Sequence, residues 1–247
     1  MLYLCYRTFY RLSNMALVVC GAVSDETVLR IADEVLPIAE DEAAPVLCRN
    51  ENEAEPPEVL TPYSEQKMQV SKPIFNIGIK DTDIPADGRA RQKKDAAMAI
   101  LDEMLFSRAG AIYNDLLDRD LIFPALSYGY TISESSAYNS IAGEADDPKT
   151  VLCEIKKHLA RIKETGLSRE DFVRGKRVMY AEFVKSFDST DSIANNLFSF
   201  ICEDSEMLSY AEILEEITFD EVCALFEHAF DEEKIALAVV SPLQENN

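Results

Sequence analysis

One pattern occurs twice in this chain, first as Tyr10-Arg-Leu-Ser-Asn-Met-Ala-Leu-Val-Val-Cys20 and later as Phe230-Asp-Glu-Glu-Lys-Ile-Ala-Leu-Ala-Val-Val240. In each stretch an aromatic residue is followed by four polar or turn-forming residues and then by a six-residue apolar run. A short apolar run bounded by turn residues is typical of a buried strand. The repetition indicates an internal duplication.

The later copy follows a complete helix start, Thr218-Phe-Asp-Glu221. Thr218 accepts from the third backbone N–H, and Glu221 reaches back to the N–H of the capping residue. The earlier copy has no room for this start, because Met1 falls inside the equivalent helix. We therefore expect the chain to be a piece of a larger duplicated protein that begins within its first half.

The charge balance excludes two classes of partner. Among 247 residues, 45 are acidic and 24 are basic, which gives a net charge of −21. Such a chain repels phosphate backbones and anionic lipid surfaces, so we expect neither nucleic acid nor a membrane as a partner. The acidity serves solubility, or alternatively it lines a chamber that prefers cationic peptides.

The cysteines and the apolar runs indicate a cytoplasmic protein. The six cysteines are scattered and form no C-x-x-C pair, a pattern typical of reduced thiols in the cytosol. The first seven residues are too short and too aromatic for a signal-peptide core. No apolar run approaches the roughly 20 residues that span a bilayer.

Composition divides the chain into three parts. Residues 1–40 hold the strand-like run Met15–Cys20 and a helix that opens at Ser24, and we expect them to be the end of a first half. Residues 41–61 are acidic and rich in proline, which predicts an extended linker. Residues 62–247 are expected to form a complete second half.

The second half alternates strand patterns with helix patterns. Strands are predicted at Lys67–Val70, Ile74–Lys80 and Ile235–Val240, with a hairpin formed by Leu126–Ser133 and Ala137–Glu144. Helical periodicity covers the intervening segments, including about 88–105, 112–117, 147–166, 168–187, 191–202 and 218–230. This order predicts an α+β fold with an antiparallel-rich sheet packed with helices.

The residues provide no catalytic constellation. His158 follows Glu154 by four residues on a predicted helix, which would make half a metal site, yet no further ligand is evident. His228 lies near a helix C-terminus, where an imidazole suits the helix dipole. Neither histidine lies in H-E-x-x-H or its inversion, and no glycine-rich phosphate loop is present.

Several segments, taken in order, resemble the pitrilysin/insulinase family of zinc metallopeptidases, in particular its short bacterial, processing-peptidase-like branch. The matching segments are Phe9–Ser24, Leu105–Ile122, Gly143–Pro148, Gly166–Phe172 and Ile217–Val240. Each motif is loose by itself, but their order and spacing cover most of the chain outside the linker. The part that they resemble is the end of the first half and the whole C-terminal half, which lacks the zinc motif.

The resemblance implies a fold and a division of labour. Family members consist of two similar α+β halves that close around a peptide. The first half carries His-x-x-Glu-His, where zinc activates water and the glutamate is the general base. We therefore expect this chain to have no catalytic residue, no metal ligand and no cofactor of its own, with zinc in the missing N-terminal half. The expected partners are a peptide substrate and either that half or a homologous subunit.

The chain departs from the family pattern at two positions. In active members the second half often adds an arginine and a tyrosine that contact the substrate carbonyl, and the corresponding positions are Leu117 and Phe123. Arg108 and Tyr128 are the best nearby candidates for substituted substrate contacts, although surface pairing and hairpin packing explain them equally well. Arg119 and Tyr130 are weaker candidates for the same role.

Three hypotheses for the function remain open. The first is a substrate-enclosing, non-catalytic half that acts in peptide binding and proteolysis only with the zinc-bearing half. The second is a pseudo-peptidase or scaffold subunit that pairs with an active homologue. The third is an unrelated α+β interaction domain. In each case residues 1–40 need a surface to pack on, which also allows a homodimer by exchange between copies.

Overall fold

The computed structural model describes residues 1–36 and 56–243. These residues form two compact units, one made of 1–36 and 184–202 and the other of 56–183 and 203–243. The predicted linker at 41–61 lies largely outside the described residues.

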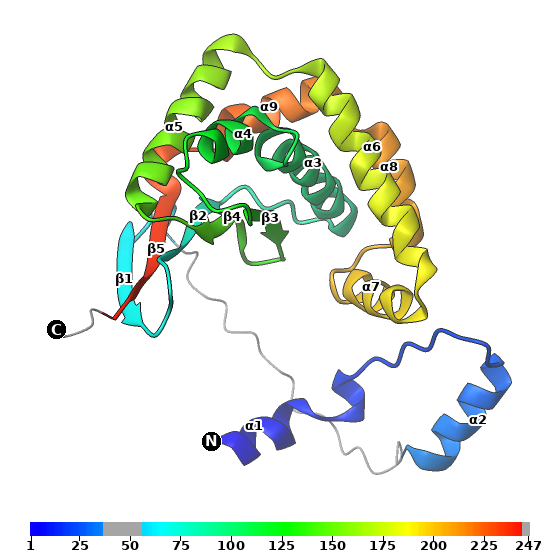
Figure 1. Cartoon of the computed structure of the whole chain (residues 1–247). Helices are drawn as coiled ribbons and strands as arrows, with labels where there is room; N and C mark the ends of the chain where they lie inside the picture. Colours follow the sequence, from blue (N-terminus) through cyan, green and yellow to red (C-terminus); the bar gives the residue numbers. More distant parts are fainter. Residues whose placement is uncertain (37–55, 244–247) are drawn as a thin grey trace. The chain divides into compact units, whose positions relative to one another are not determined.

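The larger unit contains a five-stranded sheet (Figure 1). Its strands are β1 (Tyr63–Met68), β2 (Ile74–Asp81), β3 (Ser127–Ile132), β4 (Ala137–Glu144) and β5 (Ile235–Pro242). Their order in space is β1-β5-β2-β4-β3. β1 pairs with β5 in parallel, and the other three pairings are antiparallel. The predicted antiparallel-rich α+β fold is therefore confirmed.

The helices of this unit pack on one face of the sheet or on one another. They are α3 (Gly88–Phe106), α4 (Ala111–Asp118), α5 (Pro148–Thr165), α6 (Arg169–Lys185), α8 (Tyr210–Glu216) and α9 (Phe219–Ala229). Figure 1 shows α3, α5 and α9 on the same side of the strands. The core lies between these layers, where alternate strand residues such as Ile77, Ile141 and Leu237 are almost fully buried against α3 and its neighbours.

Local sequence explains where the helices start and stop. Asp147 caps α5 by accepting from the backbone N–H of Thr150, and Pro148 occupies the first turn, where a missing N–H costs nothing. Gly166, with a φ of 84°, ends the same helix. The predicted capping box of α9 is present: Thr218 accepts from the N–H of Glu221, whose carboxylate accepts from the N–H of Thr218.

The smaller unit has little core of its own. Residues 1–36 form α1 (Leu2–Phe9), the 3-10 turn η1 (Leu12–Asn14) and α2 (Asp25–Val35), which Ser24 caps. The unit also contains the 3-10 turn η3 (Ser186–Asp188) and α7 (Thr190–Cys202). No residue of 1–36 is buried, although both α1 and α2 carry exposed apolar side chains.

Three expectations about individual elements were wrong. The run Met15–Cys20 is extended but is not a strand, because no segment within the described ranges pairs with its backbone. The first strand of the sheet is Tyr63–Met68 rather than the predicted Lys67–Val70. The prediction failed because all six residues of this strand are exposed and show no apolar alternation. The short helix α8 was not predicted, because seven residues carry too little periodicity.

Candidate functional site

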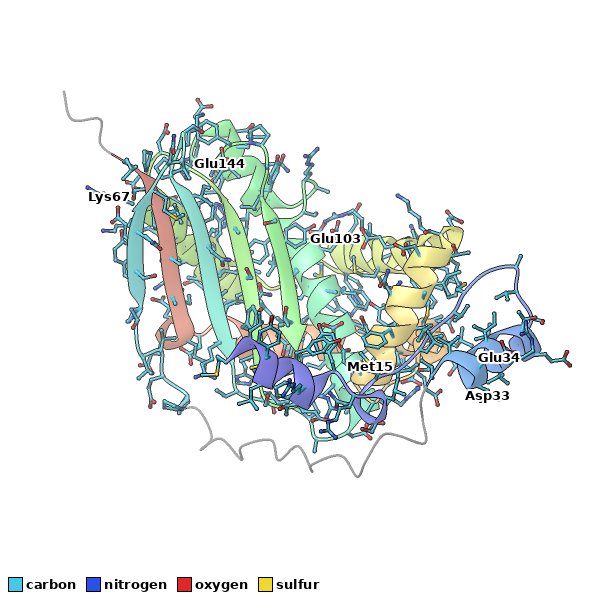
Figure 2. All side chains as sticks on the ribbon, turned by 90° about the horizontal axis from the view of Figure 1, so that it is seen from below. Met15, Asp33, Glu34, Lys67, Glu103 and Glu144 are labelled. Atoms are coloured by element: carbon cyan, nitrogen blue, oxygen red, sulfur yellow. The ribbon has the colours of Figure 1, made fainter. Side chains whose placement is uncertain are left out.

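Figure 2 looks onto the sheet face opposite the helices, with Glu144 at one end of β4. The middle of this face is formed by small side chains. Because side chains alternate along a strand, cross-strand partners form rows on one face. One row crosses all five strands and consists of Ser64, Ala238, Asn76, Ala142 and Ser127. The next row consists of Ala236, Gly78, Ser140 and Gly129. We call these nine residues the open face; none of them is charged, whereas Lys80 and Glu144 lie on the same face nearer the strand ends.

At two glycines of this face, the position that a side chain would occupy is free. A Cβ built on Gly78 or on Gly129 would meet no heavy atom within 4 Å. Where β1, β5 and β2 lie side by side, the surface is hollowed by about 460 Å³, with Ser64, Asn76 and Ala238 among the lining residues. This face therefore has room for an extended ligand and presents small polar side chains, such as Ser64, Asn76 and Ser140, instead of reactive ones.

Tyr128 does not belong to the open face. It lies on the edge strand β3 and points toward the helices, where its ring lies 6.2 Å from that of Phe106. Its hydroxyl donates to Glu103 Oε2 on α3 at 2.7 Å. Burial, together with this bond to a carboxylate, raises the pKa of Tyr128. Its hydroxyl thus already has a strong partner within the chain.

The other three predicted contact residues lie in or around α4. Leu117 is half-buried and packs against the core, and the ring of Phe123 holds the ammonium of Lys72 at 3.1 Å from its centre. Arg108 is exposed in the turn that joins α3 to α4, and its guanidinium makes no hydrogen bond or ion pair within residues 1–36 and 56–243. No hydrogen bond or ring contact within the described part joins two of the four predicted side chains.

Glu154 and His158, which the sequence analysis considered as two possible metal ligands, are both engaged by neighbouring charged side chains. Glu154 binds Arg119 at 2.7 Å and Lys157 at 2.7 Å, and these bonds lower the pKa of Glu154 to about 2. His158 is buried and lies between Asp115 Oδ2, at 2.8 Å from Nε2, and Arg161, at 3.2 Å from Nδ1. No group of three or more metal-ligating side chains occurs in the described parts of the chain. The described residues therefore do not fit a catalytic zinc ion.

Sequence reasoning missed two buried polar contacts behind the sheet. On α3, Asp102 accepts from Asn139 Nδ2 of β4 at 2.6 Å. Nearby, Asp81 binds both Lys94, at 2.9 Å, and the hydroxyl of Tyr130, at 2.7 Å. Asp102 could have been found from the sequence, because it is a polar residue at an otherwise apolar helix position. Its partner Asn139 could not, because it lies 37 residues away and is brought to Asp102 by strand pairing alone.

A comparison with protein families places the chain. The family described as peptidase M16 inactive domain matches residues 1–179. The chain therefore belongs to this family, and the predicted relationship to the C-terminal half of pitrilysin-type zinc peptidases is confirmed.

Individual relatives agree with this assignment. An uncharacterized zinc protease, YmfH, of Bacillus subtilis (strain 168) is 26% identical over 242 residues, which are 98% of this chain and 56% of that protein. The structure of an M16-like peptidase from Alicyclobacillus acidocaldarius matches with a TM-score of 0.82 and 25% identity over 98% of this chain and 57% of that one. A peptidase M16 inactive domain from Pseudomonas fluorescens shares the fold, with a TM-score of 0.66 and 15% identity, over 91% of this chain and 53% of that one. The chain thus spans little more than half the length of the first two relatives.

Within residues 1–36 and 56–243, no helix is long and apolar enough to cross a membrane. The cysteines in these ranges are free thiols: Cys5, Cys20, Cys153, Cys202 and Cys223.

Proposed function

We propose that this chain is the substrate-enclosing, non-catalytic part of a zinc metallopeptidase. It acts in peptide binding and proteolysis only together with a half that carries the His-x-x-Glu-His motif. The observation that carries the proposal is the match of residues 1–179 to an inactive peptidase domain. The described residues of the chain also hold no metal-ligand cluster.

The open face supports the enclosing role. A wall that closes a peptide chamber needs free space and hydrogen-bonding groups, and it needs no nucleophile or general base. Ser140 Oγ donates to Asn76 Oδ1 at 3.0 Å, so these two polar side chains hold each other in place. Gly78 and Gly129 leave the space above them free.

We also propose that Arg108 contacts the substrate outside the open face. Its exposed guanidinium suits a carbonyl or carboxylate of a peptide. Tyr128 would have to release Glu103 before it reached a ligand, and Leu117 and Phe123 offer only apolar contact. Cytoplasmic location is part of the same proposal and is supported by the free cysteines.

A second candidate function is a pseudo-peptidase or scaffold subunit that pairs with an active homologue, and a homodimer is one form of such a pairing. The observation in its favour is that the expected arginine and tyrosine positions hold Leu117 and Phe123. The first packs against the core and the second stacks under Lys72. Neither side chain supplies a hydrogen bond to a substrate carbonyl.

Filling the open face tests the enclosing role. Gly78→Phe and Gly129→Phe place a ring in empty space on a strand, where an aromatic residue is favoured over glycine, so the fold should be retained. Each variant is mixed with the zinc-motif half from the same organism, and peptide cleavage and complex formation are measured. We expect kcat/KM to fall about tenfold or more, a loss of about 1.4 kcal/mol, with the complex intact.

The matched control is Glu164→Phe, which adds the same ring at an exposed position on α5 and should leave cleavage unchanged. Unchanged cleavage by both glycine variants would contradict the proposal that this face encloses substrate. A stable complex without any cleavage, in the unsubstituted protein, would favour the pseudo-peptidase.

A further inference from the structure

The strand β1 forms one edge of the sheet, and its outer side is open. In the part of the chain that the structure describes, β1 pairs with β5 alone, and all six of its residues are exposed. Figure 2 shows it as the outermost strand, with Lys67 near its C-terminal end. An uncovered edge strand offers unpaired backbone N–H and C=O groups to another chain. The edge of β1 is thus a surface to which a further strand can be added.

The register with β5 decides which backbone groups of β1 face outward. The carbonyls of Pro62 and Met68 accept from N–H groups of β5. Because backbone groups alternate in direction along a strand, every second residue of β1 faces β5, and the residues between them face away from it. These outward residues are Tyr63, Glu65 and Lys67. Their backbone N–H and C=O groups have no partner within residues 1–36 and 56–243.

Two of the outward residues carry opposite charges, and they lie on either side of Gln66. The carboxylate of Glu65 is held in place by two hydroxyls: Tyr63 donates to Oε2 at 2.6 Å, and Ser241 donates to Oε1. A carboxylate can accept more than two hydrogen bonds, so Glu65 is positioned for another donor. The ammonium of Lys67 makes no hydrogen bond or ion pair within the described ranges.

We propose that this chain forms a homodimer by antiparallel pairing of β1 with β1 of a second copy. The two-fold axis passes through Gln66, so Glu65 lies opposite the partner's Lys67, and Lys67 lies opposite the partner's Glu65. This arrangement is self-complementary, as a two-fold interface requires. The two sheets join into one, with the helices of both copies on the same face.

Charge selects both the second copy and the register. Charged residues on an edge strand normally prevent pairing. Opposite charges placed directly across two strands stabilise a pair, whereas like charges destabilise it. Shifting the partner by two residues in one direction would place Glu65 opposite its own equivalent, and a shift in the other direction would do the same to Lys67. A shift by one residue would leave outward backbone groups without facing partners. The register centred on Gln66 pairs both charges.

The interface does not depend on the proposed function. It uses the outer edge of β1, and the open face stays uncovered in both copies, on one side of the joined sheet. Main-chain hydrogen bonds provide the affinity, as in other cases of strand addition. Because the contact involves one short strand from each copy, the dimer belongs to the small, reversible class of interfaces.

Sedimentation equilibrium of the full chain, over about a hundredfold range of concentration, tests the pairing. We expect a reversible equilibrium between monomer and dimer. Glu65→Lys or Lys67→Glu places like charges at both symmetry-related contacts, so each variant should raise the dissociation constant about tenfold or more. A mixture of the two variants should form a heterodimer about as stable as the unsubstituted homodimer, because each lysine again lies opposite a glutamate.

The matched control is Glu164→Lys, which makes the same change in net charge at an exposed position on α5 and should leave the dissociation constant unchanged. All of these variants should melt like the unsubstituted protein, because the substituted side chains are exposed. A chain that is monomeric at every concentration would overturn the proposal. A dimer that the two β1 variants do not weaken, or two variants that fail to associate when mixed, would overturn it as well.

Hydrogen exchange measured at single residues tests the backbone contacts. In the dilute monomer the amides of Glu65 and Lys67 should exchange freely, whereas those of Ser64 and Gln66 face β5 and should be protected. In the dimer we expect exchange of Glu65 and Lys67 to slow at least about tenfold. Protection of these two amides that appears only when the zinc-motif half or a peptide is added would assign the edge to a different strand and overturn self-pairing.

Discussion

Asp102 of α3 and Asn139 of β4 form a buried pair between helix and sheet. Asp102 Oδ1 accepts from Asn139 Nδ2 at 2.6 Å, and both residues are about 1% exposed. Asp102 Oδ2 and Asn139 Oδ1 have no other partner within the described parts of the chain. One proton on Asp102 would satisfy both atoms by closing a cyclic acid–amide pair. Burial raises the pKa of Asp102 to about 7, the bond from Asn139 opposes this rise, and the charge of Asp95 adds to it.

The pair predicts that stability falls as pH rises through the neutral range. The folded-state pKa of Asp102 lies above its unfolded value. At pH values between these two pKa values, the native state therefore binds one proton that the unfolded state does not bind. The stability contributed by this proton is fully present below the unfolded pKa of about 4 and is lost as pH approaches about 7. Between about pH 5 and pH 8 the free energy of unfolding should decrease by about 2–3 kcal/mol from this group.

Asp102→Asn isolates that effect, because an amide keeps both hydrogen bonds to Asn139 and does not titrate. The variant should match the unsubstituted protein near pH 5 and exceed it near pH 8 in urea unfolding. A smaller slope will remain from Asp95, whose pKa is also raised to about 7 by burial and by the charge of Glu203. A variant that is less stable at both pH values would contradict the protonated pair.

Lys94 should be among the costliest charged residues to remove. Its side chain is 9% exposed, and its ammonium binds Asp81, which also accepts from the hydroxyl of Tyr130. Burial alone would raise the pKa of Asp81, but the bonds from Lys94 and Tyr130 outweigh it and the pKa is lowered. Lys94→Met leaves a mostly buried carboxylate without its cation and should cost about 2–4 kcal/mol.

Arg89→Met is the control for Lys94→Met. It removes an ion pair with Glu216 whose side chains are about half exposed, and it should cost less than about 1 kcal/mol. Equilibrium unfolding in urea compares the two variants. Similar losses in the free energy of unfolding would show that burial does not make the Lys94–Asp81 pair more important for stability than an exposed pair.

The capping box of α9 should contribute to the stability of the larger unit. Thr218→Ala removes the acceptor for the N–H of Glu221 and should lower the free energy of unfolding by about 1 kcal/mol. Ser24→Ala removes the equivalent cap of α2, which lies in a segment without buried residues, and should leave the main unfolding transition unchanged. Equal effects on this transition would contradict the description of residues 1–36 as lacking a core.

The sequence predicted those parts of the fold that depend on local signals. The capping box at Thr218 and the proline at the start of α5 lie within a few residues of the helices that they begin, and both predictions are confirmed. The hairpin of β3 and β4 was also found, because its strands alternate around a polar turn in which the N–H of Ser133 donates to the carbonyl of Ser136.

What the sequence did not predict depends on contacts between distant segments. β1 has no buried residue and hence no apolar alternation, so its start was misplaced. The run Met15–Cys20 has the composition of a strand, but composition does not supply the neighbouring strands that pairing requires. Asp102 and Asn139 are ordinary polar residues until the fold buries them together.

Under the proposed function, this chain closes a peptidase whose zinc lies in another half. The most direct test is to measure zinc content and peptide cleavage for this chain alone, for the zinc-motif half alone, and for their mixture. We predict bound zinc only where the His-x-x-Glu-His motif is present, and chelator-sensitive cleavage only in the mixture. Chelator-sensitive cleavage by this chain alone would contradict the account.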